Sequence, residues 1–277
     1  MPENKPKIAA IQLASGPNVG ANLLETERLV AEAVEAEAQL VALPENFSFM
    51  GKQEQDLISV AESSGNGPLQ DFLSQIARKY KIWIVGGTIP IKTANSDLVR
   101  SACILFDDHG QQVARYDKIH LFDVHLIDAG EKYMESAAIE PGNQVVVADT
   151  PFGRLGLAVC YDLRFPELFR AMLDQGLNII ALPASFTAIT GKAHWELLIR
   201  TRAIENLSFV VAAAQGGYHI SGRQTHGHSM IVSPWGSILA EVNKGTGMIV
   251  SHIEPGCQDN MRRNFPALTH RKIKCSI

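Results

Sequence analysis

Residues 154–162 are RLGLAVCYD, and they are followed by PELFRAMLDQG at 166–176 and NIIALPAS at 178–185. The first and third segments are short apolar runs, whereas the second has apolar residues at helical spacing and ends at a glycine. A short apolar run is typical of a buried strand, and the wider spacing is typical of an amphipathic helix. Together these segments predict a strand–helix–strand unit, the building block of layered α/β proteins.

The same alternation continues in both directions along the 277-residue chain. We predict strands at 7–14, 39–45, 81–90, 207–215 and 247–253, helices at 22–38, 69–80 and 190–206, and hairpins at 101–117 and 228–242. The hairpin turns fall at His109-Gly110 and at Pro234–Gly236, where glycine favours a tight turn. No linker, repeat or low-complexity segment divides this series. We therefore expect an α/β fold with a single domain over residues 1–277, in which the irregular segments 46–67 and 119–143 line a site.

Charge and composition exclude several classes of partner. The formal net charge is −4 and both signs are mixed along the chain, so no basic surface for nucleic acid or an anionic membrane is expected. No apolar run reaches the roughly 20 residues that span a bilayer, and the first residues lack the layout of a signal peptide. The cysteines, Cys103, Cys160, Cys257 and Cys275, form no Cys-x-x-Cys pair, which argues against a zinc site or a disulfide framework. We expect a cytoplasmic protein without a nucleic-acid or membrane partner.

Three polar residues stand at the ends of predicted strands. Cys160 follows LGLAV, Glu45 ends QLVALPE, and Lys118 follows QQVARYD. A thiol is a nucleophile, a carboxylate in a partly dry pocket gains the raised pKa of a general base, and an ammonium favours the thiolate and binds an oxyanion. The alternatives are a buried structural thiol, as we expect for Cys103, a solvated glutamate and a surface lysine. Spacing alone leaves these alternatives open.

Three segments resemble, in order, the signature blocks of the nitrilase (carbon–nitrogen hydrolase) superfamily: LPENF at 43–47, YDKIHLFDV at 116–124 and GLAVCYDLRFPEL at 156–168. The resemblance covers nearly the whole chain and implies a four-layer α-β-β-α sandwich. It also implies a catalytic triad of Glu45, Lys118 and Cys160. By the same resemblance Glu135, in ESAAIEPG, supports the triad, and the backbone N–H of Tyr161 holds the oxyanion.

The implied reaction is amide hydrolysis through a cysteine thioester, which requires no metal or cofactor. His226 and His228 lack carboxylate or thiol neighbours in sequence, which argues against a metal site there. Members of the family usually associate through their helical layers, so we expect a homodimer or a larger homo-oligomer. The apolar face of 166–173 and the C-terminal tail, about 256–277, are the predicted parts of that interface.

Four further segments are similar to the deaminated glutathione amidase branch of the superfamily: CYDLRFPEL, PASFTAITGKAHWELLIRTRAIEN, VVAAAQGG and GHSMIVSPWG. This branch implies hydrolysis of deaminated glutathione to 2-oxoglutarate and cysteinylglycine. The alternatives are an ω-amidase or general short-chain amidase and, from another class, a catalytically silent binding protein on the same fold.

Three residues are candidates for substrate binding. The guanidinium of Arg164 is suited to a bidentate pair with a substrate carboxylate, although an ion pair with Asp162 or Glu167 is the structural alternative. His194 and Trp195 are expected at the start of a helix, where they form either a wall of the substrate pocket or a helix cap.

Overall fold

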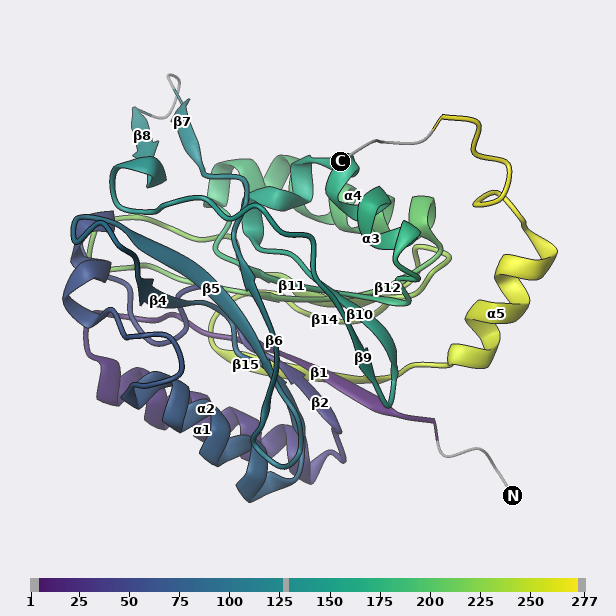
Figure 1. Ribbon diagram of the computed structural model, residues 1–277, viewed down its shortest axis with the longest axis horizontal. Helices are drawn as coiled ribbons and strands as arrows, with labels where there is room; N and C mark the ends of the chain where they lie inside the picture. The colour runs from purple at the N-terminus through teal and green to yellow at the C-terminus, as the bar shows by residue number, and fades with distance from the viewer. Residues whose placement is uncertain (1–4, 127–129, 274–277) are drawn as a thin grey trace.

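The computed structural model describes residues 5–126 and 130–273, so Cys275 and the end of the C-terminal tail lie outside the described residues (Figure 1). The first sheet has the order β15-β1-β2-β3-β5-β4, with β6 paired to β5. Its strands are β1 (Lys7–Gln12), β2 (Leu40–Ala42), β3 (Trp83–Val85), β4 (Ile89–Lys92), β5 (Val99–Phe106), β6 (Gln112–Asp117) and β15 (Gly247–His252). Its central strands β1, β2 and β3 are parallel, and β15 and β5 flank them in antiparallel pairing.

The second sheet has the order β14-β13-β12-β11-β10-β9. Its strands are β9 (Val147–Thr150), β10 (Gly153–Leu157), β11 (Ile179–Ala184), β12 (Phe209–Ala214), β13 (Ser229–Val232) and β14 (Ile238–Val242). Here β10, β11 and β12 are parallel, while β9 and β13 pair antiparallel to them. Each sheet therefore has a parallel centre, in which the carboxyl ends of the strands lie at one edge.

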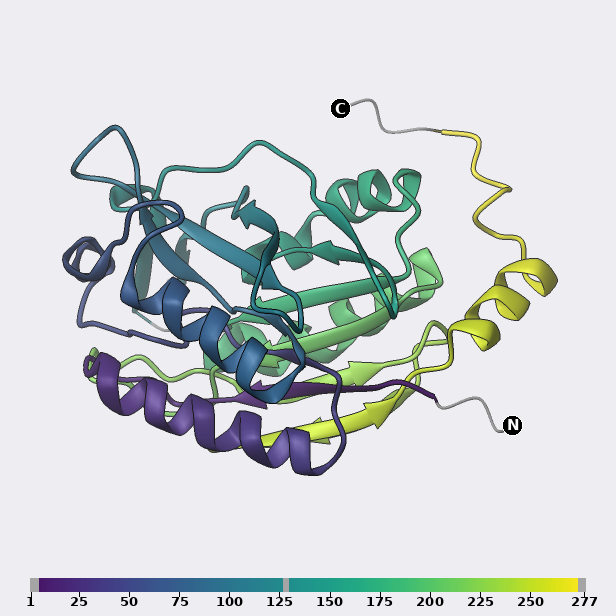
Figure 2. The same cartoon turned by 60° about the horizontal axis from the view of Figure 1, so that its bottom comes forward.

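Helices cover the outer face of each sheet (Figures 1 and 2). The helices α1 (Val19–Glu35) and α2 (Pro68–Tyr80) lie against the first sheet, and α3 (Pro166–Asp174) and α4 (Ala188–Asn206) against the second. This arrangement is a four-layer α-β-β-α sandwich, which confirms the fold that the signature segments implied. A fifth helix, α5 (Pro255–Asn264), extends along one side of the molecule (Figure 1) and was not expected from the sequence.

The strand alternation of β1 explains why two sheets and two helical layers pack together. Ile8 and Ala10 belong to the core between the two sheets, whereas Ala9 and Ile11 pack with residues of α1 and α2. Successive side chains of a strand point to opposite faces, so a strand that is apolar at every position has to be covered on both sides.

Two sequence predictions need correction at the ends of elements. The predicted strand 154–162 ends at Leu157, and Cys160–Arg164 forms a short 3₁₀ helix, η4. The predicted helix 190–206 begins at Ala188, where the side chain of Thr187 accepts a hydrogen bond from the backbone N–H of Thr190. His194 and Trp195 therefore lie beyond the first turn of α4.

The apolar face of α3 is also used differently from our expectation. Leu168, Phe169 and Met172 are buried in the core of the chain itself. That face is therefore not available for contact with a second copy, and the part of the interface predicted at 166–173 is wrong.

The irregular segments 46–67 and 119–143 contain short regular elements. The first includes the 3₁₀ helix η1 (Glu54–Val60), and the second includes the paired strands β7 (Asp123–Leu126) and β8 (Glu131–Met134) and the 3₁₀ helix η3 (Glu135–Ala137). Parts of both segments line a cavity of about 570 Å³.

Candidate active site

The candidate site lies where the carboxyl ends of strands from both sheets meet. Glu45 follows β2, Lys118 follows β6, and Cys160 and Ser185 follow the parallel strands β10 and β11. All four residues are buried. Because the two sheets pack face to face, residues separated by up to 140 positions in sequence come into contact.

Lys118 is the centre of this group. Its ammonium nitrogen lies 2.8 Å from Oε1 of Glu45, and 2.7 and 2.8 Å from the two carboxylate oxygens of Glu135. Glu135 also accepts a hydrogen bond from the backbone N–H of Phe122 at 2.7 Å. A fully buried ammonium is costly unless it is paired, and two carboxylates satisfy it here.

Ser185 joins Glu45 to Cys160. Its hydroxyl donates to Oε2 of Glu45 at 2.6 Å, and its backbone N–H donates to the sulfur of Cys160 at 3.5 Å. The structure thus brings Glu45, Lys118, Glu135 and Cys160 into one buried cluster. Ser185 is a member that the sequence did not single out.

The backbone at Cys160 is held in an uncommon conformation. Its φ angle is +47°, a left-handed value that costs free energy for any residue with a side chain. Asp162 stabilises the turn, because its carboxylate accepts from the backbone N–H of Val159 at 2.8 Å and from the hydroxyl of Tyr116 at 2.7 Å. The other oxygen of Asp162 lies 2.7 Å from Nδ1 of His120, so the turn is tied to the segment that carries Lys118.

The backbone at Glu45 is fixed by close packing. The side-chain amide of Gln215 donates to the carbonyl of Glu45 at 3.0 Å. Gly87, at φ +55°, lies so near Pro44 that a Cβ atom at this position would stand 2.2 Å from the Pro44 carbonyl oxygen. Only glycine fits there, and its small size lets the loop after β3 pass beside Pro44 and Glu45.

The charges of the cluster determine its protonation. Burial opposes ionisation of Glu45, but the charge of Lys118 and hydrogen bonds from Lys118, Ser185 and the Cys160 thiol lower the pKa of its carboxyl. Burial raises the pKa of Glu135, although Lys118 acts against it. The pKa of Lys118 is raised, because the attraction of Glu135 and Glu45 exceeds the effect of burial. Glu45 is therefore an ionised carboxylate. The raised pKa that we expected for it from the sequence is wrong.

The pKa of the Cys160 thiol is also shifted, and this shift corrects an expectation from the sequence. Burial, together with the charge of Glu45, raises the pKa of Cys160 well above its ordinary value, and Lys118 offsets only part of this effect. Lys118 alone therefore does not produce a resting thiolate. The sulfur is a neutral thiol beside an ionised carboxylate, an arrangement in which the nucleophile transfers its proton as it attacks.

The model of the carbon–nitrogen hydrolase family matches residues 7–262. The chain belongs to this family. Among curated proteins, it is 42% identical to a deaminated glutathione amidase from Yersinia enterocolitica over 271 residues, which cover 98% of this chain and 94% of that protein. The family membership indicated by the three signature segments is confirmed, and the chain is a hydrolase of carbon–nitrogen bonds.

Two solved structures of the superfamily are similar to this carbon–nitrogen hydrolase. The first is Saccharomyces cerevisiae Nit3, with a TM-score of 0.87, 30% identity and 97% of each chain covered. The second is a mutant amidase from Nesterenkonia sp., with a TM-score of 0.78, 26% identity, and 95% of this chain and 99% of that chain covered. That protein is a Glu-to-Gln mutant that shows the result of Michael addition of acrylamide at the active site cysteine.

In this carbon–nitrogen hydrolase, Cys160 opens into a narrow pocket of about 10 Å³, which has room for about one water molecule. The pocket is lined by Phe122, Glu135, Cys160, Tyr161, Arg164, Ser185, Phe186, Thr190 and Arg223. Tyr161 therefore borders the same pocket as Cys160. The proposed role of its backbone N–H as an oxyanion donor stays a prediction.

Arg164 lies at this pocket. Its guanidinium carbon stands 5.2 Å from the ring centre of Phe186, and Nη1 lies 3.2 Å from Nδ1 of the exposed His194. No ion pair to Asp162 or Glu167 forms among the described residues, and Asp162 is bound instead to Tyr116 and His120. Arg164 thus lines the pocket without a carboxylate partner among the described residues, and the exposed His194 contacts it.

Trp195 does not line the pocket. Its side chain is fully buried against Phe186, with 4.9 Å between the ring centres, and its Nε1–H donates to the carbonyl of His228 at 2.7 Å. Its polar atom is satisfied and its ring belongs to the core. Trp195 therefore has no access to this pocket, because the helix turns by about 100° per residue and carries its ring into the core while His194 faces solvent.

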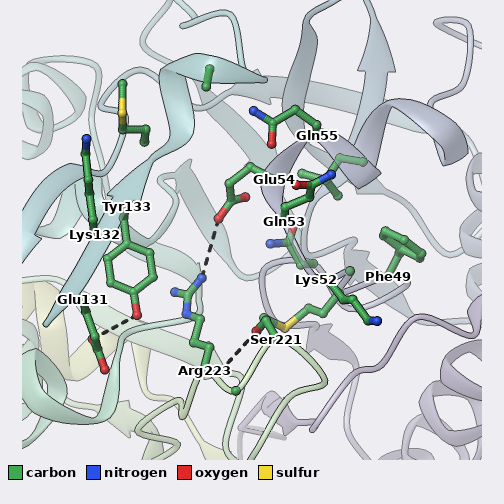
Figure 3. Close-up of a pocket in the computed structure, with 17 residues that line it drawn as sticks. Phe49, Lys52, Gln53, Glu54, Gln55, Glu131, Lys132, Tyr133, Ser221 and Arg223 are labelled. Carbon is green, nitrogen blue, oxygen red and sulfur yellow. Dashed lines mark hydrogen bonds and ion pairs between the residues drawn. The ribbon is translucent and has the colours of Figure 1, made fainter.

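Arg223 is the functional candidate that the sequence analysis missed. It lies in the loop between β12 and β13 and contacts the carbonyl and hydroxyl of Ser185. Its guanidinium carbon stands 5.1 Å from the ring centre of Tyr133, and its Nη1 lies 4.0 Å from Oε1 of Glu54 (Figure 3). Arg223 lines both the narrow pocket and a larger neighbouring cavity.

The described parts of the chain show neither a metal centre nor a membrane span. In residues 5–126 and 130–273, no three side chains of His, Cys, Asp or Glu gather as metal ligands do. Within the same residues, every helix is too short or too polar to pass through a bilayer.

Proposed function

We propose that this carbon–nitrogen hydrolase is a thiol amidase whose substrate is deaminated glutathione, which it splits into 2-oxoglutarate and cysteinylglycine. The observation that carries the proposal is the buried cluster in which Ser185 contacts both the sulfur of Cys160 and the carboxylate of Glu45. The similarity to the Yersinia enterocolitica deaminated glutathione amidase over nearly the whole of both chains supports this substrate.

In the first step Glu45 takes the thiol proton of Cys160 while the sulfur bonds to the amide carbon. The π electrons of the carbonyl move to its oxygen, and the oxyanion is held by Lys118 and the backbone N–H of Tyr161. A positioned general base typically contributes about 10²–10⁴ in rate, and an oxyanion donor roughly 10²–10³.

In the second step the oxyanion reforms the carbonyl and the carbon–nitrogen bond breaks. Glu45 gives its proton to the leaving nitrogen, so that cysteinylglycine departs as a neutral amine and a thioester remains on Cys160. A water molecule then gives a proton to Glu45 and attacks the thioester, and the acid leaves as the sulfur regains its proton. Glu135 holds Lys118 in place throughout.

The Nesterenkonia amidase supports the assignment of the nucleophile. In that protein a cysteine at the active site adds to acrylamide even when glutamate is replaced by glutamine. Addition to the double bond of acrylamide is a typical reaction of a cysteine nucleophile. Cys160 is the cysteine of this chain that borders the narrow pocket.

We assign the carboxylate of the substrate's acyl half to Arg164. A guanidinium binds a carboxylate through two parallel hydrogen bonds, and Arg164 has no carboxylate partner among the described residues. The narrow pocket holds only about 10 Å³, so the half-buried side chains of Arg164 and Tyr161 have to move when the acyl group enters.

The test compares wild type with Cys160→Ala on deaminated glutathione and 2-oxoglutaramate. We expect wild type to release 2-oxoglutarate and cysteinylglycine from the first substrate, and Cys160→Ala to release neither. The matched control is Cys257→Ala, which removes an exposed thiol and should leave the rate unchanged. Full activity in Cys160→Ala would refute the thioester route.

A second candidate function is ω-amidase activity, favoured by the small volume beside Cys160. A substrate that loses only ammonia needs little space for its leaving group. Release of ammonia from 2-oxoglutaramate without any hydrolysis of deaminated glutathione would establish this candidate in place of the first.

We further propose that the whole chain acts as one catalytic domain in the cytosol and forms a homo-oligomer. The free thiols Cys103, Cys160 and Cys257 are suited to a reducing compartment. Trp235 and Phe265, half exposed and 5.7 Å apart between ring centres, form an apolar patch near the C-terminal tail that suits contact with a second copy. A monomeric mass in light scattering would contradict this assembly.

A further inference from the structure

A cavity of about 570 Å³ lies next to the narrow pocket of Cys160 (Figure 3). It is lined by residues from three segments: 46–57, 131–137 and 221–223. Its volume falls in the range of about 300–1,000 Å³ that small-molecule sites occupy. Arg223 is the residue that lines both spaces, so the cavity and the narrow pocket adjoin at this side chain.

The charged groups of this cavity are not all paired. Arg223 lies near Glu54, and Glu131 accepts a hydrogen bond from the hydroxyl of Tyr133 at 3.0 Å. Lys52 and Lys132 are exposed and have no ion-pair partner in the part of the chain that the structure describes. In Figure 3 they lie on opposite sides of the pair formed by Arg223 and Glu54. The lining therefore carries three positive charges, on Lys52, Lys132 and Arg223, against the two negative charges of Glu54 and Glu131, and this positive excess favours an anion.

In the proposed thioester route, the two halves of the amide substrate occupy different spaces after the carbon–nitrogen bond breaks. The acyl half stays bonded to the sulfur after the carbon–nitrogen bond breaks, so it has to remain in the narrow pocket with Arg164. The amine half has to leave. The open cavity lies on the other side of Arg223 from the narrow pocket and has room for the amine half.

We propose that this cavity is the leaving-group subsite and that it binds an amine of dipeptide size through its carboxylate. Lys52 and Lys132 attract the carboxylate, and Arg223 marks the junction with the acyl pocket. The inference rests on the proposed function and adds to it, because it explains how the enzyme selects a substituted amide over an amide that releases ammonia.

The test uses two substrates that share one acyl group and differ only in the leaving group. Deaminated glutathione releases cysteinylglycine, whereas 2-oxoglutaramate releases ammonia. In the double variant Lys52→Glu/Lys132→Glu we expect the KM for deaminated glutathione to rise about tenfold or more. The kcat/KM for 2-oxoglutaramate should stay within about twofold of wild type, because its leaving group never reaches the rim.

The control is Lys244→Glu, which makes one Lys-to-Glu exchange at an exposed loop position outside the cavity. It should leave both substrates unaffected. Equal losses on both substrates in the double variant, or no loss on either, would overturn the leaving-group subsite while leaving the proposed function intact.

Inhibition provides a readout that does not require turnover of deaminated glutathione. Added cysteinylglycine should inhibit the hydrolysis of 2-oxoglutaramate by wild type, and the double variant should need about tenfold more of it. If wild type fails to hydrolyse deaminated glutathione, the proposed substrate is wrong. If cysteinylglycine also fails to inhibit, the subsite is wrong as well.

Discussion

The backbone N–H of Ser185 is directed at the sulfur of Cys160, with 3.5 Å between nitrogen and sulfur. The hydroxyl of the same serine donates to Glu45 at 2.6 Å, so one residue at the end of β11 orients both the candidate nucleophile and its base. Its main chain sets the position of the thiol, and its side chain supports the negative charge that receives the thiol proton.

Replacing Ser185 with alanine should therefore remove the hydrogen bond to the carboxylate of Glu45. It should keep the backbone N–H that contacts the sulfur of Cys160. A hydrogen bond to a charged group is worth about 1.5–3 kcal/mol, so we expect kcat to fall by about 10–100-fold. The hydroxyl helps to lower the pKa of Glu45, so its removal should raise that pKa and move the acid limb of kcat/KM to higher pH.

The control for this change is Ser237→Ala, at an exposed position outside the cluster. It should alter neither kcat nor the pH profile. An unchanged acid limb in Ser185→Ala would show that Glu45 does not set the pH dependence.

Lys118→Met should lower both activity and stability. The change leaves two buried carboxylates without their common cation, and breaking a buried pair in this way costs about 3–5 kcal/mol. The loss of an oxyanion donor should reduce kcat by at least about 10². Urea unfolding measures the loss of stability. Lys79→Met, which removes an exposed lysine paired with Glu27, should cost less than about 1 kcal/mol.

Adding Glu135→Gln to Lys118→Met separates the two effects. The second change removes one of the two like charges, so part of the lost stability should return while activity stays absent. A double variant as unstable as Lys118→Met would show that repulsion between Glu45 and Glu135 is not the cause.

The alternation of strands and helices followed from local sequence pattern, because apolar runs and helical spacing report what each element buries, whereas the four layers were implied by the resemblance of the signature segments. The same pattern placed Glu45 and Lys118 correctly at strand ends. It failed at Cys160, since the apolar residues Ala158 and Val159 extend the run beyond Leu157, where the strand ends. The 3₁₀ turn there depends on Asp162, whose partners Tyr116 and His120 are more than 40 positions away.

Long-range contacts also explain the residues that were misplaced or missed. Trp195 was expected at the start of a helix, as a wall of the substrate pocket or a cap, but its N–H is satisfied by the carbonyl of His228, which a local pattern does not reveal. Arg223 lies in a loop without periodicity and gains its importance from Ser185 and Glu54, far from it in sequence. The pKa of Glu45 was expected to be raised by burial alone, and the lowering arises because Lys118 lies so close.

Arg164→Gln should discriminate between charged and neutral substrates. If Arg164 binds the carboxylate of the acyl half, its loss removes hydrogen bonds worth about 1.5–3 kcal/mol for an anionic amide and nothing for a neutral one. We expect kcat/KM for 2-oxoglutaramate to fall by about 10–100-fold, and that for butyramide to stay nearly constant. Arg78→Gln, an exposed site on α2, is the control. Equal losses on both amides would assign Arg164 a structural role.

His226 makes the stability of the protein depend on pH. Its ring is half-buried and stacks on His228 with 4.3 Å between the ring centres. Burial, with the nearby charge of His228, lowers the pKa of His226 from 6.5 to about 4. Between these two values the unfolded chain binds a proton that the folded chain does not, so the stabilising contribution is complete above pH 6.5 and is lost as the pH falls through about 4.

His226→Gln should remove part of this loss, because glutamine does not titrate. Allowing for the partial exposure of the ring, we expect the fall in the free energy of unfolding between pH 7 and pH 4.5 to shrink by about 1–2 kcal/mol. Urea unfolding at the two pH values measures the difference within each variant, so a constant loss of packing cancels. The exposed His109→Gln should leave the fall as large as in wild type. If the fall in the free energy of unfolding is the same in His226→Gln and His109→Gln, His226 titrates alike in the folded and unfolded chain. Burial then does not control its charge.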